Sequence, residues 1–205
     1  GDGGTLPLAE ARRQPLASIA SGPAASTMGA LALRPKGATS VVVDIGGSTT
    51  DLALILDGQP LFYSKGACLD GIRLPIRAFA TRSIPLGGDS PVRLEDGLVS
   101  FAEQRRGIAA SLGGPVSTLT DALCVTGHNQ VGDRQRALAA LATLGEAEQI
   151  AAAAVEAAVQ RLEETILAML ADWRQEPVYR LWELLRKGDR RPDDLVGVGG
   201  AAEAL

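Results

Sequence analysis

The sequence predicts an α/β fold, because strand-like and helix-like patterns occupy separate parts of the chain. Residues 40–45 (SVVVDI) form a β-branched run that ends in a glycine pair, and residues 52–56 are apolar again, a pattern typical of strand, tight turn and strand. Apolar residues recur at three- to five-residue steps over 134–173, which favours helices. Residues 194–200 (DLVGVGG) predict a last short strand that runs into glycines.

The other elements are short and are separated by turn residues. Before the first strand the chain is alanine-rich and helical in pattern, and Pro23 suits the first turn of a new helix for which Ser21 is a candidate N-cap. The turn pairs Asp57-Gly58 and Asp96-Gly97 separate further strands. We predict helices over 7–33 (broken at Gly22-Pro23), 120–127, 134–173 (interrupted at Gly145), 178–187 and from Ala201 onward, strands over 59–64, 82–86 and 91–94, and a loop over 98–114.

Length and composition exclude several classes of protein. The chain has 205 residues, 46% of them hydrophobic, which is enough for one domain with a core of its own. It contains one histidine and two cysteines, so a multi-histidine zinc centre and a disulfide framework are both excluded. The net charge of -4 gives no basic surface for nucleic acid, and no apolar run is long enough to span a membrane. A cytoplasmic protein that acts on small molecules or binds proteins is the default expectation.

The strongest local motif is VVVDIGGSTTDLALI, residues 41–55. A buried strand would carry Asp44 to the mouth of a turn whose glycines leave backbone amides accessible, and three hydroxyl residues follow. Amides and hydroxyls suit phosphate oxygens, and a carboxylate suits Mg²⁺. The motif lacks the lysine of a Walker loop and the spacing of a dinucleotide loop. The alternative is an ordinary hairpin with a glycine turn.

A second glycine turn lies near the end of the sequence. Residues 196–202 (VGVGGAA) again read as strand, glycine pair and helix start, which can border a nucleotide and direct backbone amides at an anion. Taken alone, such a turn is more often a plain strand–helix connection. Two glycine turns of this kind in one chain are more informative than either alone.

These strings resemble known loops. DIGGSTTD looks like the second phosphate loop of the superfamily of actin, sugar kinases and chaperone ATPases, and VGVGGAAEAL resembles its adenosine loop. More closely, four strings occur in the order found in the hydantoinase A and 5-oxoprolinase family: SGPAASTMGA (21–30), VVVDIGGSTTDLALI (41–55), RSIPLGGDS (82–90) and TLTDALCVTG (118–127). The resemblance implies an actin-like, ribonuclease H-like α/β lobe with a mixed sheet and a helical insertion over about 113–193.

The resemblance also implies a function and a set of site residues. In this family ATP is thought to phosphorylate a carbonyl oxygen, which implies ATP-dependent hydrolysis or activation of a cyclic amide of the hydantoin or 5-oxoproline type. By matching position, Asp44 would hold the magnesium ion, directly or through water, and Asp51 would orient water or stabilise the turn. The residues expected to hold ATP are Gly46, Gly47, Ser48, Thr49 and Thr50 at the phosphates, and Gly199, Gly200 and Ala201 at the adenosine.

One part of the superfamily pattern is not found in these residues. Its members carry a first phosphate loop in an N-terminal half, so we interpret residues 1–205 as the second lobe of a larger protein, or as one that needs a partner subunit. We expect the isolated lobe to bind nucleotide weakly or not at all and to be inactive. Two other functions stay open: a nucleotide-dependent regulatory or chaperone-like module, and an assembly subunit without catalysis.

Lesser candidates have structural alternatives that are at least as good. The turn Gly87–Ser90 could approach the nucleotide or be a plain β-turn. Cys124 and His128, four residues apart, invite a thiolate–imidazole pair, although apolar neighbours suggest that the cysteine is a core residue. Asp121 with His128 is a weaker metal candidate. The pair Arg105-Arg106 is most simply a solvated loop charge.

Overall fold

The computed structural model describes residues 1–33, 37–69, 72–175, 192–202 and 204. The chain divides into two compact units. The first, here called the sheet unit, comprises Gly1–Val43, Asp51–Arg82 and Ile166–Val196. The second, here called the loop unit, comprises Asp44–Thr50, Ser83–Thr165 and Gly197–Leu205. Both glycine turns singled out in the sequence therefore belong to the loop unit.

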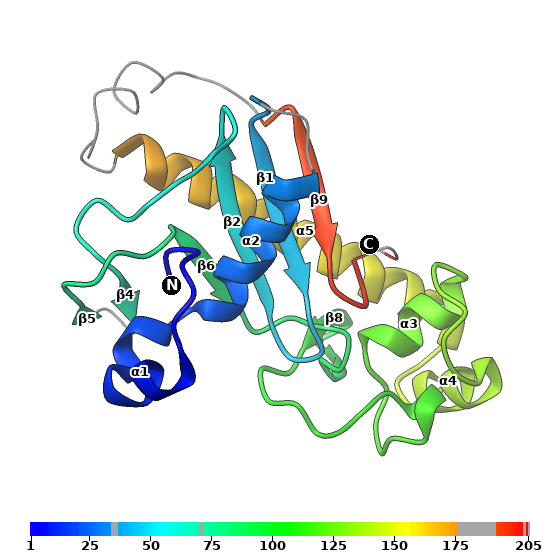
Figure 1. Cartoon of the computed structure of the whole chain (residues 1–205). Helices are drawn as coiled ribbons and strands as arrows, with labels where there is room; N and C mark the ends of the chain where they lie inside the picture. The colour runs from blue at the N-terminus through cyan, green and yellow to red at the C-terminus, as the bar shows by residue number, and fades with distance from the viewer. Residues whose placement is uncertain (34–36, 70–71, 176–191, 203, 205) are drawn as a thin grey trace. The chain divides into compact units, whose positions relative to one another are not determined.

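The central sheet has the strand order β3-β2-β1-β9, and β6 also pairs with β2 (Figure 1). Its strands are β1 (Ser40–Ile45), β2 (Thr50–Leu56), β3 (Gln59–Pro60), β6 (Thr81–Ile84) and β9 (Asp194–Val198). The side chains of Val41–Val43 and Leu52–Leu56 are buried almost without a break. Continuous burial of this kind is typical of central strands covered on both faces, which explains the uninterrupted apolar runs.

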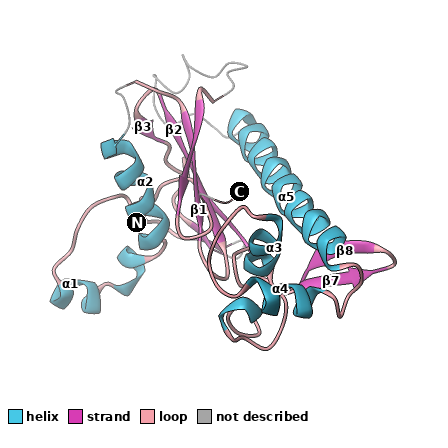
Figure 2. Ribbon diagram, turned by 90° about the vertical axis from the view of Figure 1, so that its right-hand side faces the viewer, coloured by secondary structure: helices cyan, strands magenta, loops and turns pink. Residues whose placement is uncertain are grey.

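Helices of the sheet unit flank these strands. They are α1 (Leu8–Arg13), the 3-10 turn Pro15–Ser18, α2 (Ser21–Leu33) and the end of α5 (Ala147–Gln175). The break lies before Ser21 and not at Gly22-Pro23 as predicted, because α2 begins at Ser21 and accommodates Pro23 in its first turn. Figures 1 and 2 show α2 against one face of the sheet. Arg82 on β6 forms an ion pair with Asp172 of α5. Two short strands, β4 (Cys68–Leu69) and β5 (Ile72–Arg73), pair with each other in a separate antiparallel sheet.

The loop unit has a small core of its own. The antiparallel hairpin of β7 (Val92–Glu95) and β8 (Leu98–Phe101) packs with α3 (Leu119–Thr126), α4 (Arg134–Leu141) and the first part of α5 (Figure 2). A 3-10 turn, Ala110–Leu112, precedes α3. The buried residues of this core are Val92, Ala122, Cys124, Val125, Ala137, Leu141, Ile150, Ala151 and Ala154. Many are alanines, so the helices approach closely.

Four sequence-based expectations need revision or lie beyond what can be compared. The predicted loop over 98–114 begins with β8, because Asp96 and Gly97 both have positive φ (52° and 78°), as a two-residue hairpin turn of type I′ requires. Strand β3 stops at Pro60, short of the predicted 59–64, and beyond it the Leu61 amide continues the contact with β2, donating to the Leu54 carbonyl oxygen at 2.9 Å. Residues 201, 202 and 204 are in turns and not in a helix. The helix predicted over 178–187 lies outside the described residues.

Within the described part of the chain, no helix combines the length and the apolarity needed to cross a membrane.

Candidate functional site

The turn between β1 and β2 is closed on itself and open to solvent. Strand β1 ends with half-buried Asp44 and buried Ile45, and β2 begins with fully buried Thr50. Between them the Gly46 amide donates a hydrogen bond of 2.9 Å to the Thr49 carbonyl oxygen. Residues 46–49 are exposed. We call residues 46–50 the phosphate turn.

The phosphate turn offers unused hydrogen-bond donors. Among the described residues, none accepts a hydrogen bond from the backbone amides of Gly47, Ser48 or Thr49. The two hydroxyl side chains of this stretch are exposed as well. Successive free amides in a turn form a concavity that binds anions, so the residues present fit the phosphate groups of a nucleotide.

A second glycine turn, Gly87–Ser90, holds the phosphate turn in place. The Gly88 amide donates to the Gly46 carbonyl oxygen at 2.9 Å, and the Asp89 amide donates to the Gly47 carbonyl oxygen at 2.7 Å. A Cβ atom at Gly87 would stand 2.6 Å from both of those carbonyl oxygens, so only glycine fits. The Gly87–Ser90 turn therefore contacts the phosphate turn, and its approach to a nucleotide stays a prediction.

The third glycine turn follows β9 and meets Asp44. Gly199 has a φ of 93°, and a Cβ atom there would stand 2.8 Å from Asp44 Oδ1. Gly200 is exposed, with no atom within 4 Å of its would-be Cβ, whereas Ala201 is buried near Gly88. The predicted adenosine turn and the predicted magnesium residue, about 150 positions apart in sequence, are therefore neighbours in the loop unit.

The structure distributes the predicted site residues unevenly between the units. The loop unit contains Asp44, Gly46, Gly47, Ser48, Thr49, Thr50, Gly199, Gly200 and Ala201. Asp51 belongs to the sheet unit, where it lies half-buried on β2. Because side chains alternate along a strand, Asp51 points to the face opposite buried Thr50, whose hydroxyl donates to the Leu86 carbonyl oxygen at 2.6 Å.

Asp121 is a structural carboxylate that supports these turns. It is fully buried and accepts hydrogen bonds from the amides of Ala110 (3.0 Å), Ser111 (2.7 Å) and Thr118 (2.8 Å), and from the Thr118 hydroxyl (3.1 Å). Next to it, the amide and hydroxyl of Thr120 both donate to the Gly88 carbonyl oxygen at 2.8 Å. Asp121 thus fixes the start of α3, and α3 holds the Gly87–Ser90 turn.

The metal interpretation of Asp121 and His128 is wrong, because both carboxylate oxygens of Asp121 are already occupied by hydrogen-bond donors. No group of three or more potential metal ligands occurs among the residues that the structure describes. The function of Asp121 was readable in the sequence, since Thr118-Leu-Thr-Asp121 matches a capping box and the structure has one.

The thiolate–imidazole interpretation is also wrong. Cys124 is buried in the loop-unit core, and this burial raises the pKa of its thiol, with the Asp121 carboxylate adding to the shift. Neutral thiols are poor nucleophiles. The ring of His128 instead forms a hydrogen bond of 2.7 Å between Nδ1 and the Thr126 hydroxyl. Cys124 is a core residue.

A charged pair beside the phosphate turn was missed by the sequence reading. Arg105 Nη2 lies 2.6 Å from Asp89 Oδ2, so this arginine is not a free loop charge. The partners are separated by 15 residues of turn and hairpin, and only the tertiary structure brings them together. The motif RSIPLGGDS had singled out Asp89, but nothing local identifies its partner.

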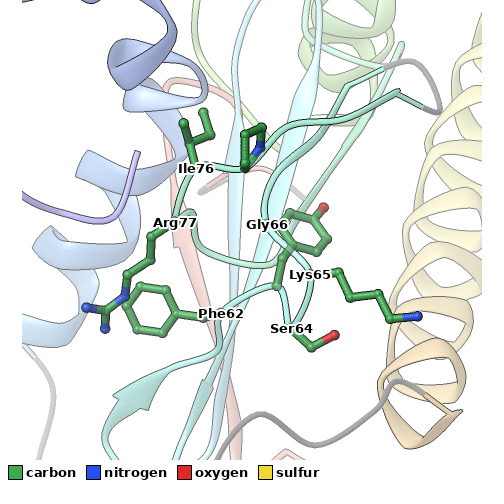
Figure 3. Close-up of a pocket in the computed structure, with 8 residues that line it drawn as sticks. Phe62, Ser64, Lys65, Gly66, Ile76 and Arg77 are labelled. Carbon is green, nitrogen blue, oxygen red and sulfur yellow. The ribbon is translucent and has the colours of Figure 1, made fainter.

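The sheet unit contains a separate cavity of about 200 Å³ (Figure 3). The Arg77 guanidinium stacks over the Phe62 ring at 4.0 Å, and the Lys65 side chain extends in another direction. The Tyr63 hydroxyl donates to the Thr81 carbonyl oxygen, and burial raises the pKa of that hydroxyl. The charged groups do not converge, so this cavity is a weaker candidate than the phosphate turn.

The fold and the three turns define a class of protein. It is an α/β fold with a mixed sheet and flanking helices, in which a glycine turn meets the carboxylate at the end of a strand. The sequence matches the family model described as hydantoinase/oxoprolinase over residues 1–205. The chain belongs to the hydantoinase/oxoprolinase family, which confirms the resemblance read from its four motifs.

Comparison with solved structures supports the same fold. The chain is similar to the nucleotide-free structure of acetone carboxylase, an enzyme of ATP-dependent acetone carboxylation, with a TM-score of 0.63 and 23% sequence identity. The match covers 75% of this chain and 25% of that chain, so the present chain corresponds to a limited part of that protein. A search of curated proteins gave no match.

Proposed function

We propose that this chain is one lobe of an ATP-dependent enzyme that activates the carbonyl group of a cyclic amide of the hydantoin or 5-oxoproline type. The observation that carries the proposal is that, within one unit, the Gly87–Ser90 turn contacts the phosphate turn and the Gly199 turn contacts Asp44, which directly precedes that turn. Membership of the hydantoinase/oxoprolinase family supports the reaction class.

Each turn has a role in the proposal. The free amides of Gly47, Ser48 and Thr49, with the hydroxyls of Ser48 and Thr49, bind the phosphate oxygens. Thr50 is buried and anchors the turn to Leu86. Gly199, Gly200 and Ala201 border the adenosine, and the open space at Gly200 leaves room for a flat ligand.

Asp44 is the proposed magnesium residue. Its carboxylate lies at the junction of the phosphate turn and the Gly199 turn, half-buried at the end of β1. Carboxylate oxygens are the ligands that Mg²⁺ prefers. A bound magnesium ion would neutralise phosphate charge, directly on Asp44 or through water. Asp51, the residue after the phosphate turn, orients water or stabilises the turn.

Activation of the carbonyl then depends on positioning. Phosphoryl transfer needs little covalent chemistry from the protein and relies on orientation and on neutralisation of charge. The hydrogen bonds that join the Gly87–Ser90 turn to the phosphate turn provide that rigidity. The proposed lobe supplies one side of the nucleotide site, and a second lobe or a partner subunit supplies the substrate side.

The test is coupled turnover by the two-lobed protein. We expect hydantoin or 5-oxoproline to stimulate ATP hydrolysis, with ring opening in proportion to the phosphate released. If no cyclic amide changes the rate of ATP hydrolysis but a protein partner does, the protein is a regulatory or chaperone-like module and not an enzyme of this class. A protein that binds no ATP would be an assembly subunit.

A further inference from the structure

The Asp89 carboxylate lies against the phosphate turn. A Cβ atom at Gly47 would stand 2.9 Å from Asp89 Oδ2, and the Asp89 side chain is only 14% exposed. A carboxylate at this distance repels a polyphosphate on the same turn, and it does so more strongly where water is largely excluded. The site therefore requires a compensating positive charge.

Arg105 supplies that charge. Its Nη2 atom contacts Asp89 Oδ2 at 2.6 Å, and its Nε donates to the Gly107 carbonyl oxygen at 3.2 Å. Two contacts from different nitrogens fix the plane of the guanidinium. A guanidinium has five N–H donors, so others stay available, and the side chain is 46% exposed.

The backbone that presents Arg105 is also fixed. Gly107 has a φ of 141°, and a Cβ atom there would stand 2.9 Å from Pro115 Cδ, so this loop packs closely on the segment that precedes α3. Ala109 forms an isolated parallel bridge with Val116. Through the two amides of residues 110 and 111, the same loop is tied to Asp121. The Arg105 loop and the Gly87–Ser90 turn therefore share one anchor at the start of α3.

We propose that Arg105 contacts the phosphate groups of a nucleotide bound at the phosphate turn, and that Asp89 is the positioning residue that holds the guanidinium there. The inference rests on the proposed function. Its physical basis is that the phosphate turn carries no cation of its own, and that arginine can bind a carboxylate and a phosphate with different edges of one planar group.

The competing interpretation is that the pair only stabilises the loop. A stabilising pair would affect all ligands alike, because loss of the loop would disturb the whole turn. Loss of a phosphate contact would weaken the binding of ligands that carry phosphates and leave the binding of adenosine unchanged. The ratio of the affinities for Mg-ATP and adenosine therefore separates the two interpretations.

The experiment measures binding of Mg-ATP, Mg-ADP and adenosine to the two-lobed protein by calorimetry. We expect Arg105→Gln to weaken Mg-ATP binding by roughly ten- to a hundredfold, the loss of a charged hydrogen bond, and to leave adenosine binding within about twofold. The affinity of Arg105→Lys for Mg-ATP should lie between that of the unmodified protein and that of Arg105→Gln, because lysine keeps the charge but not the planar fork. Asp89→Asn should reduce the ratio of the Mg-ATP affinity to the adenosine affinity less than Arg105→Gln does. The variant with both substitutions should lose little more Mg-ATP affinity than Arg105→Gln alone.

Arg93→Gln is the matched control. Arg93 belongs to the same unit and forms an exposed pair with Glu95 at 3.5 Å on the β7–β8 hairpin, so its loss changes net charge equally. We expect no change in the ratio. An unchanged ratio in Arg105→Gln and Arg105→Lys, in a protein that binds Mg-ATP, overturns this inference and leaves the proposed function standing. Absence of Mg-ATP binding by the unmodified protein overturns both.

Discussion

Gly199 lies so close to Ile45 that a Cβ atom on it would stand 2.4 Å from the Ile45 carbonyl oxygen. Its φ of 93° is also one that residues with a side chain rarely adopt. Gly199→Ala should therefore destabilise the protein by more than the roughly 1–2 kcal/mol of the left-handed conformation alone. Urea unfolding measures this loss.

Gly200→Ala is the control for that substitution. The neighbouring glycine has no atom within 4 Å of its would-be Cβ and no positive φ, so its replacement should change the free energy of unfolding by less than about 0.5 kcal/mol. Equal effects of the two substitutions would contradict the close approach of the Gly199 turn to the end of β1.

Asp121→Ala should be among the most destabilising single changes in the loop unit. It removes one acceptor from three buried backbone amides and one hydroxyl, and each buried donor left without a partner costs about 1–3 kcal/mol. We expect a loss of roughly 3 kcal/mol or more, measured by chemical unfolding, with faster hydrogen exchange at the amides of residues 110 and 111.

Asp133→Ala gives the comparison for a helix cap at the surface. The exposed Asp133 side chain accepts hydrogen bonds from the amides of Gln135 and Arg136 at the start of α4. Loss of such a cap costs about 1 kcal/mol. If Asp121→Ala cost no more than this control, the buried network would not be the anchor of the Arg105 loop.

Cys124 and Cys68 should differ sharply in reactivity. Cys68 is exposed, whereas burial raises the pKa of the Cys124 thiol above its ordinary value of 9.0. Iodoacetamide at pH 8 should modify Cys68 quickly and Cys124 only on unfolding, as mass spectrometry of the two peptides would show. Rapid alkylation of Cys124 in the folded protein would restore the case for a functional thiolate.

The same pKa predicts a loss of stability in alkali. In the unfolded chain the Cys124 thiol releases its proton near its ordinary pKa, while the folded protein retains the proton to higher pH. The unfolded state therefore binds fewer protons in that window, and the free energy of unfolding falls as the pH rises above about 9. The raised pKa of Tyr63, caused mainly by burial, acts in the same direction above its ordinary value of 10.0. Cys124→Ala should make the decline near pH 9 shallower.

The elements that depend on local sequence were predictable. The β-branched run of β1, the glycine pair after it and the apolar run of β2 lie within one short stretch, and the structure confirms them. Gly145 was correctly read as separating two helices, since α4 ends at Leu141 and α5 begins at Ala147. Elements of this kind can be predicted from a short stretch of sequence alone.

What could not be predicted depends on contacts between distant residues. Strand β8 (Leu98–Phe101) is mostly apolar, but it was grouped with the polar residues that follow it as one loop, and its pairing with β7 is seen only in the folded chain. The Asp89–Arg105 pair and the approach of Gly199 to Asp44 likewise exist only in the folded chain. The capping box of Asp121 was readable from local spacing and was overlooked in favour of metal chemistry.

The most direct test of the central claim is a crystal structure of the two-lobed protein with Mg-ADP. The account predicts phosphate oxygens within hydrogen-bonding distance of the amides of Gly47, Ser48 and Thr49, and the magnesium ion on Asp44 or on water held by it. Phosphates bound away from residues 46–50, with these amides still facing solvent, would contradict it.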